Sequence, residues 1–72
     1  MVWYVVYQVS GLAPQSQRYA TEEDAIHAAR THRKLGRAVL ELGYEIEGTR
    51  SKKLDADGIA QIAPLTPNSL LH

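Results

Sequence analysis

The run of residues at the start of the chain constrains the fold most. From Val2 to Val9 every residue except Gln8 is β-branched or aromatic, and such side chains favour a strand. Successive side chains of a strand point to opposite faces, so this strand is apolar on both. A strand of that kind is normally covered on both sides. The run therefore predicts a strand whose two faces must both be buried against other side chains or against a second chain.

The length of 72 residues allows one domain, which we expect over residues 1–64, followed by a tail over 65–72. Without cysteine, neither a disulfide nor a thiolate zinc site can support the small core. Eight basic and eight acidic side chains balance, so there is no long-range attraction to nucleic acid or anionic lipid. No apolar run approaches the ~20 residues of a membrane helix, and the N-terminus lacks signal-peptide features. We therefore expect a cytoplasmic protein without membrane contact.

A helix is predicted to begin at Thr21, because a hydroxyl followed by three acidic residues is a variant of the capping box and suits the helix dipole. Its inner face is small, with Ala25, Ala28, Ala29, His32 and Leu35 on one stripe. The end is ambiguous. Gly36 after two cations indicates a C-terminus near Leu35, whereas helical spacing of apolar residues allows a continuation to Leu42. The alternation from Ala38 to Ile46 favours a strand there instead.

The remaining segments are less regular. Residues 16–20 are expected to pair back on the first strand, and residues 48–53 to form a polar, basic loop. Asp57 and Gly58 indicate a tight turn before a short last strand over residues 59–63. Together these elements predict an α+β fold in the order β-β-α-β-β, with a mainly antiparallel sheet of three or four strands and one helix on one face.

The sequence contains no arrangement typical of a catalytic or cofactor site. His27 follows Glu23 by one helical turn, but a metal would need another ligand from elsewhere. The acidic pair at Asp55 and Asp57 resembles part of a calcium loop, but Lys53 and Pro64 stand where ligands are required. We therefore predict a protein that is not an enzyme and has neither cofactor nor metal.

Basic side chains gather in two stretches, at the predicted helix end and in the loop over residues 48–53. If the fold brought them together, they would suit a phosphate backbone. This is the alternative functional hypothesis, a nucleic-acid-binding regulator that uses Arg30, Arg33, Lys34, Arg37, Arg50, Lys52 and Lys53.

A family resemblance involves the first strand and the helix. Tyr4-Val5-Val6, then Leu12 and Pro14, then Thr21-Glu22-Glu23-Asp24-Ala25-Ile26 with Ala29, resembles the N-terminal domain of HicB-type antitoxins over about residues 4–47. The chain lacks the leading strand and the Gly-Cys pair before the helix that are usual in that family. The resemblance implies a partner protein, with DNA contact as a second property.

The function predicted first is a small, non-catalytic protein-interaction module that forms a homodimer or binds a partner protein. One helix covers only one side of a sheet, so the other face of the first strand is left for a second chain. The predicted interface residues are Val2, Tyr4 and Val6 of that face, with Leu70 and Leu71 of the tail as a second contact.

Overall fold

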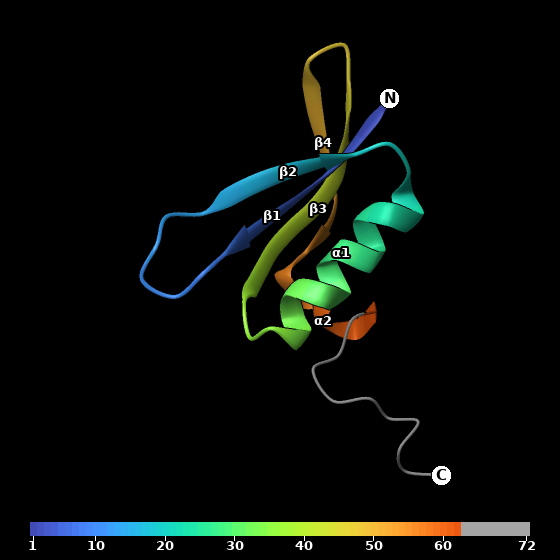
Figure 1. Cartoon of the computed structure of the whole chain (residues 1–72). Helices are drawn as coiled ribbons and strands as arrows, with labels where there is room; N and C mark the ends of the chain where they lie inside the picture. Colours follow the sequence, from blue (N-terminus) through green and yellow to red (C-terminus); the bar gives the residue numbers. More distant parts are fainter. Residues whose placement is uncertain (63–72) are drawn as a thin grey trace, which may run out of the picture.

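A computed structural model of the protein describes residues 1–62 and shows an α+β fold with one four-stranded sheet (Figure 1). The strands lie in the order β2-β1-β3-β4, and all neighbours are antiparallel. The predicted fold class is confirmed, with one addition: a second helix follows the last strand. The elements are β1 (Val2–Gln8), β2 (Gln15–Tyr19), α1 (Glu22–Lys34), β3 (Ala38–Ile46), β4 (Thr49–Asp55) and α2 (Ala56–Ile62).

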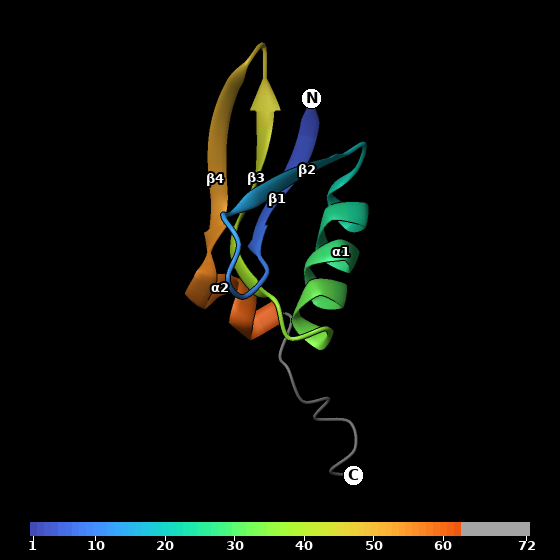
Figure 2. The same cartoon turned by 60° about the vertical axis from the view of Figure 1, so that its left-hand side comes forward.

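The core lies between one face of the sheet and the two helices. Val5 and Leu42 of the central strands are fully buried there, against Ala25 and Ala29 of α1 and Ile59 of α2. The small alanine side chains allow α1 to approach the sheet closely. Figure 2 shows α1 beside the sheet. Both helices therefore cover the same face, and the opposite face of the sheet has no described helix over it.

Helix α1 begins and ends at the signals seen in the sequence. The Thr21 hydroxyl accepts a hydrogen bond of 3.1 Å from the Asp24 backbone N–H. At the other end Gly36 has φ +80°, and its N–H donates to the Arg33 carbonyl. The Arg37 N–H donates to the carbonyl of His32, which completes a Schellman motif. The chain therefore leaves the helix at Leu35. Of the two alternatives, the strand at Ala38–Ile46 is confirmed and the continuation of the helix to Leu42 is not.

The segment that we expected to be a basic loop is strand β4. Residues Glu47 and Gly48 both have positive φ, 51° and 80°, which is typical of a two-residue type I′ hairpin turn. The prediction was wrong because β4 lies at the edge of the sheet and is mostly exposed. Such a strand needs few apolar residues, so it lacks the alternation by which β3 was recognised.

The predicted last strand and its turn are also wrong, because residues Ala56–Ile62 form helix α2. The Asp55 carboxylate accepts a hydrogen bond of 2.9 Å from the Gly58 backbone N–H, so Asp55 caps this helix. Ile59 and Ile62, three residues apart, turn toward the core. The Asp-Gly pair that suggested a hairpin therefore lies in the first helical turn.

His32 occupies the inner face of α1, as the helical spacing predicted, and is only 7% exposed. Its ring stacks on Tyr7 with 3.8 Å between centroids, and its Nδ1 lies 3.1 Å from an Arg37 guanidinium nitrogen. A guanidinium only donates, so Nδ1 accepts and carries no proton. Burial, and then the Arg37 charge, lower the pKa of His32 below 6.5.

This environment predicts a loss of stability in weak acid. The unfolded chain binds a proton at the ordinary pKa of histidine, whereas the folded chain resists protonation until the pH is lower. The free energy of unfolding should fall by up to about 1.4 kcal/mol per pH unit between those two pKa values. Urea titrations at pH 7.5 and 5.5 check this. The dependence should be weaker in His32→Gln and unchanged in His27→Gln, a variant of an exposed position on the same helix.

Candidate interaction surface

The face of the sheet opposite the helices, hereafter the helix-free face, carries the side chains that the sequence assigned to an interface. Register places every second residue of each strand on it, so that Tyr4 lies between Arg18 of β2 and Gly43 of β3, and Lys52 of β4 lies beside Gly43. We define this face by Val2, Tyr4, Val6, Ser16, Arg18, Glu41, Gly43, Glu45, Arg50, Lys52 and Asp55.

Tyr4 lies on this face as predicted, but it is not exposed: its relative accessibility is 0%. The ring packs over Gly43, the Arg50 guanidinium lies 4.3 Å from the ring centroid, and the hydroxyl donates to the Glu41 carboxylate. Burial, and then the bond to Glu41, raise the pKa of Tyr4 to about 12. The expectation of an exposed Tyr4 is therefore wrong, because side chains of the sheet itself cover the ring.

Around Tyr4, charged side chains link three strands. The Glu45 carboxylate accepts hydrogen bonds from Arg50, at 2.7 Å, and from Arg18, at 2.9 Å. Arg50 also donates to the Ser16 hydroxyl at 2.9 Å. The hydrogen bond from Arg50, and then the bond from Arg18, lower the pKa of the Glu45 carboxyl, so this group is charged at neutral pH. The result is a fixed pattern of both charge signs across the face.

The apolar part of the helix-free face is small. Val2 is 37% exposed and Val6 is partly buried, so both keep surface that a second chain can contact. The tail residues Leu70 and Leu71, predicted as a second contact, lie outside the described residues. The face therefore combines two valines with an ordered set of charges.

The basic residues of the alternative hypothesis are not brought to one surface. Arg30 and Arg37 stay near the end of α1, where Arg30 donates to the carbonyl of Ile62 and Arg37 contacts His32. Lys53 lies on the helix side, where it pairs with Glu22 of α1 and stands 5.4 Å from the Trp3 ring. Arg33 and Lys34 belong to the last turn of α1, and Arg50 and Lys52 to the helix-free face.

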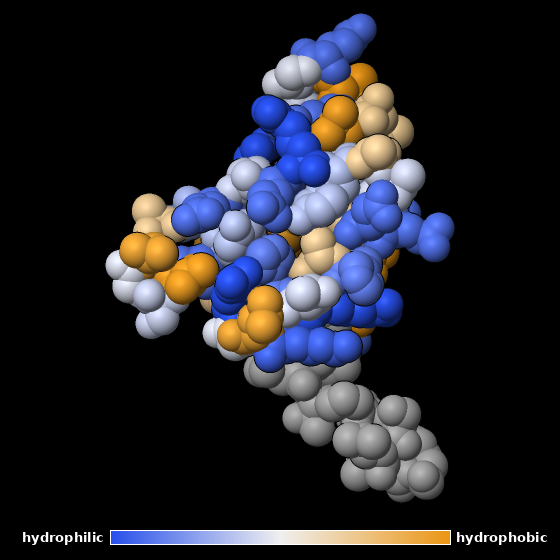
Figure 3. Space-filling view, in the orientation of Figure 1, coloured by the Kyte–Doolittle hydropathy of each residue, from blue (hydrophilic) through white to orange (hydrophobic). Residues whose placement is uncertain are grey.

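Other apolar residues are exposed as well, and one of them corrects a prediction: Leu35, which the helical spacing placed on the inner stripe, points to solvent because the helix ends at Lys34. Leu12 and Leu35 are 55% and 61% exposed, and Ile46 is 48% exposed. Figure 3 shows apolar residues in separate patches, over the β1–β2 loop, near the end of α1 and at the β3–β4 hairpin. The signal was present in the sequence, since Leu12 stands in a loop and Leu35 directly follows the helix, where few side chains surround them.

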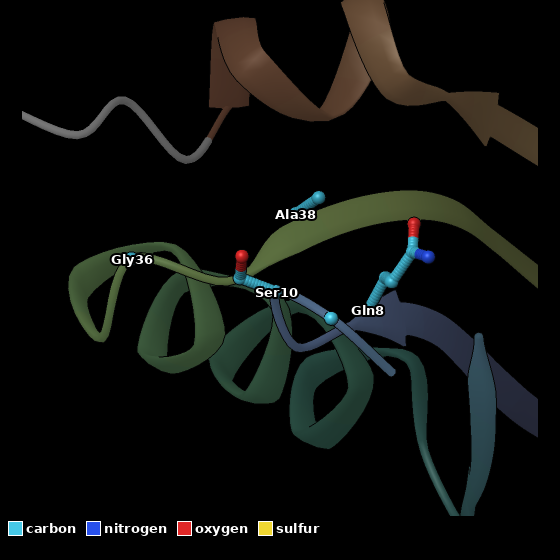
Figure 4. Close-up of a pocket in the computed structure, with 5 residues that line it drawn as sticks. Gln8, Ser10, Gly36 and Ala38 are labelled. Atoms are coloured by element: carbon cyan, nitrogen blue, oxygen red, sulfur yellow. The ribbon is translucent and has the colours of Figure 1, made fainter. Parts of the chain in front are cut away.

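One open pocket of about 360 Å³ lies where the β1–β2 loop meets the turn between α1 and β3 (Figure 4). Its lining is Gln8, Ser10, Gly11, Gly36 and Ala38, and none of these five has an ionisable side chain. The pocket therefore offers hydrogen-bonding groups without an acid or a base.

Over residues 1–62, no three His, Cys, Asp or Glu side chains gather in a group able to hold a metal ion. Neither described helix has the length and apolar character needed to cross a membrane. Comparison with known protein families, curated proteins and solved structures finds no match. The comparison therefore adds nothing to the resemblance noted in the sequence.

Proposed function

We propose that the chain is a small, non-catalytic protein-interaction module that self-associates through the helix-free face, or binds a partner protein there. The observation that carries this proposal is the absence of a helix, within the described residues, over a face on which Arg18, Glu45 and Arg50 are joined by hydrogen bonds. Ordered side chains lose little conformational entropy when a second surface meets them. A cytoplasmic location accompanies the proposal.

Among the possible occupants of this face, its charge pattern favours a second copy. The face contains three acids, Glu41, Glu45 and Asp55, and three bases, Arg18, Arg50 and Lys52. Two copies related by a two-fold axis present the same surface to each other, so a surface of mixed charge can match itself. Val2 and Val6 supply the apolar contact between these charges.

Replacing a valine of the face with a carboxylate should break the assembly. In Val6→Asp and Val2→Asp the interface would have to bury an unpaired charge, which is costly. We expect wild type to dissociate only on dilution in sedimentation velocity, and both variants to sediment as monomers at the same concentrations. Tyr4→Asp is unsuitable, because Tyr4 is buried within the protomer.

The matched control is Leu12→Asp, which adds the same charge at an exposed position of the β1–β2 loop. This variant should keep the wild-type mass, and circular dichroism should show that all variants are folded. A monomeric mass for wild type at every concentration would contradict self-association. An unchanged mass in the Val6 and Val2 variants would contradict the assignment of this face.

Nucleic-acid binding stays an alternative prediction. Its seven basic residues lie in two groups, four at or just beyond the end of α1 and three on β4, and three of them have acidic or carbonyl partners. No observation on the described residues favours it over protein binding.

A further inference from the structure

We propose that the outer edge of β4 binds an extended acidic segment of another protein, which adds to the sheet as a fifth strand. This inference rests on the proposed role as a protein-interaction module. It uses the main-chain edge of β4, whose Arg50 and Lys52 side chains also lie on the border of the helix-free face. Adding a strand to an open sheet edge is a general mode of peptide recognition, in which main-chain hydrogen bonds give affinity and side chains give specificity.

The hairpin geometry exposes the main-chain groups that such pairing needs. In a two-residue type I′ hairpin, Ile46 and Thr49 bond to each other, and pairing then alternates along the strands. The N–H and C=O groups of Arg50 and Lys52 therefore point away from β3. β4 is the last strand of the sheet, and α2 packs near its Leu54 end, on the side of the core. The edge from Thr49 to Lys52 is thus open within the described structure.

The charge of this edge selects the partner. Strand β4 carries Arg50, Lys52 and Lys53, and its one acid is Asp55 at the far end, where the carboxylate caps α2. Arg50 and Lys53 are paired to Glu45 and Glu22, whereas Lys52 is exposed and makes no ion pair with residues 1–62.

A second copy of β4 would bring cations against cations, which is unfavourable in cross-strand pairs. Edge lysines are a common means of preventing such self-pairing. An acidic strand is therefore the occupant whose charge complements this edge, and a second copy is not.

The other side of the edge adds an apolar requirement. Thr49 and Ser51 point to the helix side, and their register partners are Ile46, which is 48% exposed, and the partly buried Tyr44. Both edge residues are small, so side chains of an added strand can reach toward these two. As Figure 1 shows, the hairpin extends beyond α1 at this point, so no described helix blocks the approach. The predicted segment therefore alternates acidic residues, beside Arg50 and Lys52, with apolar ones.

The test uses a fluorescein-labelled nine-residue peptide of alternating Glu and Val, and the same peptide with Lys in place of Glu. In anisotropy titrations of the full chain, the Glu peptide should bind. The dissociation constant of the Lys peptide should be larger by about tenfold or more. Backbone amide shifts in NMR spectra should change at residues 49–53. Lys52→Glu should reverse the preference. Equal binding of the two peptides, or shifts confined to other elements, would overturn the inference.

Lys52→Pro provides a second variant, because proline removes an outward-pointing N–H without removing a bond to β3. It should abolish binding of the Glu peptide while circular dichroism stays that of wild type. If it is unfolded, the Lys52→Glu result decides. Because Lys52 also lies on the helix-free face, the mass of both Lys52 variants is measured by sedimentation velocity as well. Loss of peptide binding at an unchanged mass concerns the edge alone, whereas a change of mass in Val6→Asp with peptide binding kept concerns the proposed function alone.

Discussion

Gly43→Ala is expected to lower the free energy of unfolding by about 3 kcal/mol or more. A Cβ at this position would stand 2.2 Å from the backbone oxygen of Ser51 and 2.8 and 2.9 Å from two atoms of the Tyr4 ring and hydroxyl. The Ser51 oxygen belongs to a neighbouring strand and cannot move without displacing β4. A chain of this size has a total stability of roughly 4–11 kcal/mol, so the variant should be close to unfolding. Urea denaturation followed by circular dichroism measures the loss.

The matched control is Gly58→Ala, in which the same methyl group is added elsewhere. There the nearest atom is Cδ2 of Leu54, at 3.0 Å, and it is the end of a flexible side chain. Gly58 also lies in helix α2, where alanine is favoured over glycine by about 1 kcal/mol. We expect this variant to stay within about 1 kcal/mol of wild type. A similar small effect for Gly43→Ala would show that the strands separate easily at this point.

This glycine explains how the sheet covers its own second face. A side chain at position 43 would occupy the space of the Tyr4 ring, and without it the ring packs against β3 and its hydroxyl reaches Glu41. Arg50 then covers the ring from the other side. The need for cover that the apolar run of β1 predicted is therefore met, at Tyr4, by side chains rather than by a helix. For Val2 and Val6 cover is incomplete, which is why the proposed interface depends on them.

The sequence predicted those elements whose signals are local. The apolar run predicted β1. Thr21 and Gly36 marked the two ends of α1, and the alternation of apolar residues predicted β3. Each of these patterns reflects contacts within one element or with one buried face. The cover of Tyr4 was beyond such reasoning, because Glu41, Gly43 and Arg50 come from two other strands and meet the ring only after the register is set.

The two missed elements owe their structure to position in the fold. β4 has the composition of a loop and is a strand because β3 offers it an edge. α2 has seven residues, includes a glycine and is too short to be a stable helix in isolation. Its cap is Asp55 and its anchor is Ile59, and both depend on where β4 ends. The last prediction tests that anchor.

Ile59→Ala should lower the free energy of unfolding by about 3 kcal/mol, the usual range for truncating a fully buried isoleucine being 2–5 kcal/mol. Ile59 is 0% exposed and belongs to the same core as Val5 and Leu42. Loss of the anchor should also release α2 from the sheet and expose Leu54, which packs against the same core. Thermal and urea unfolding measure the stability, and the helical signal in circular dichroism should fall as well.

The control for this variant is Gln61→Ala in the same helix, at an exposed position where alanine is a good helix former. It should change the stability by no more than about 0.5 kcal/mol. If both substitutions had equally small effects, α2 would not be part of the cooperative unit, and the core would end at Leu42. If only Ile59→Ala is destabilising, α2 is part of the cooperative unit and completes the cover of the core face of the sheet. The helix-free face is then left as the surface that lacks a described cover.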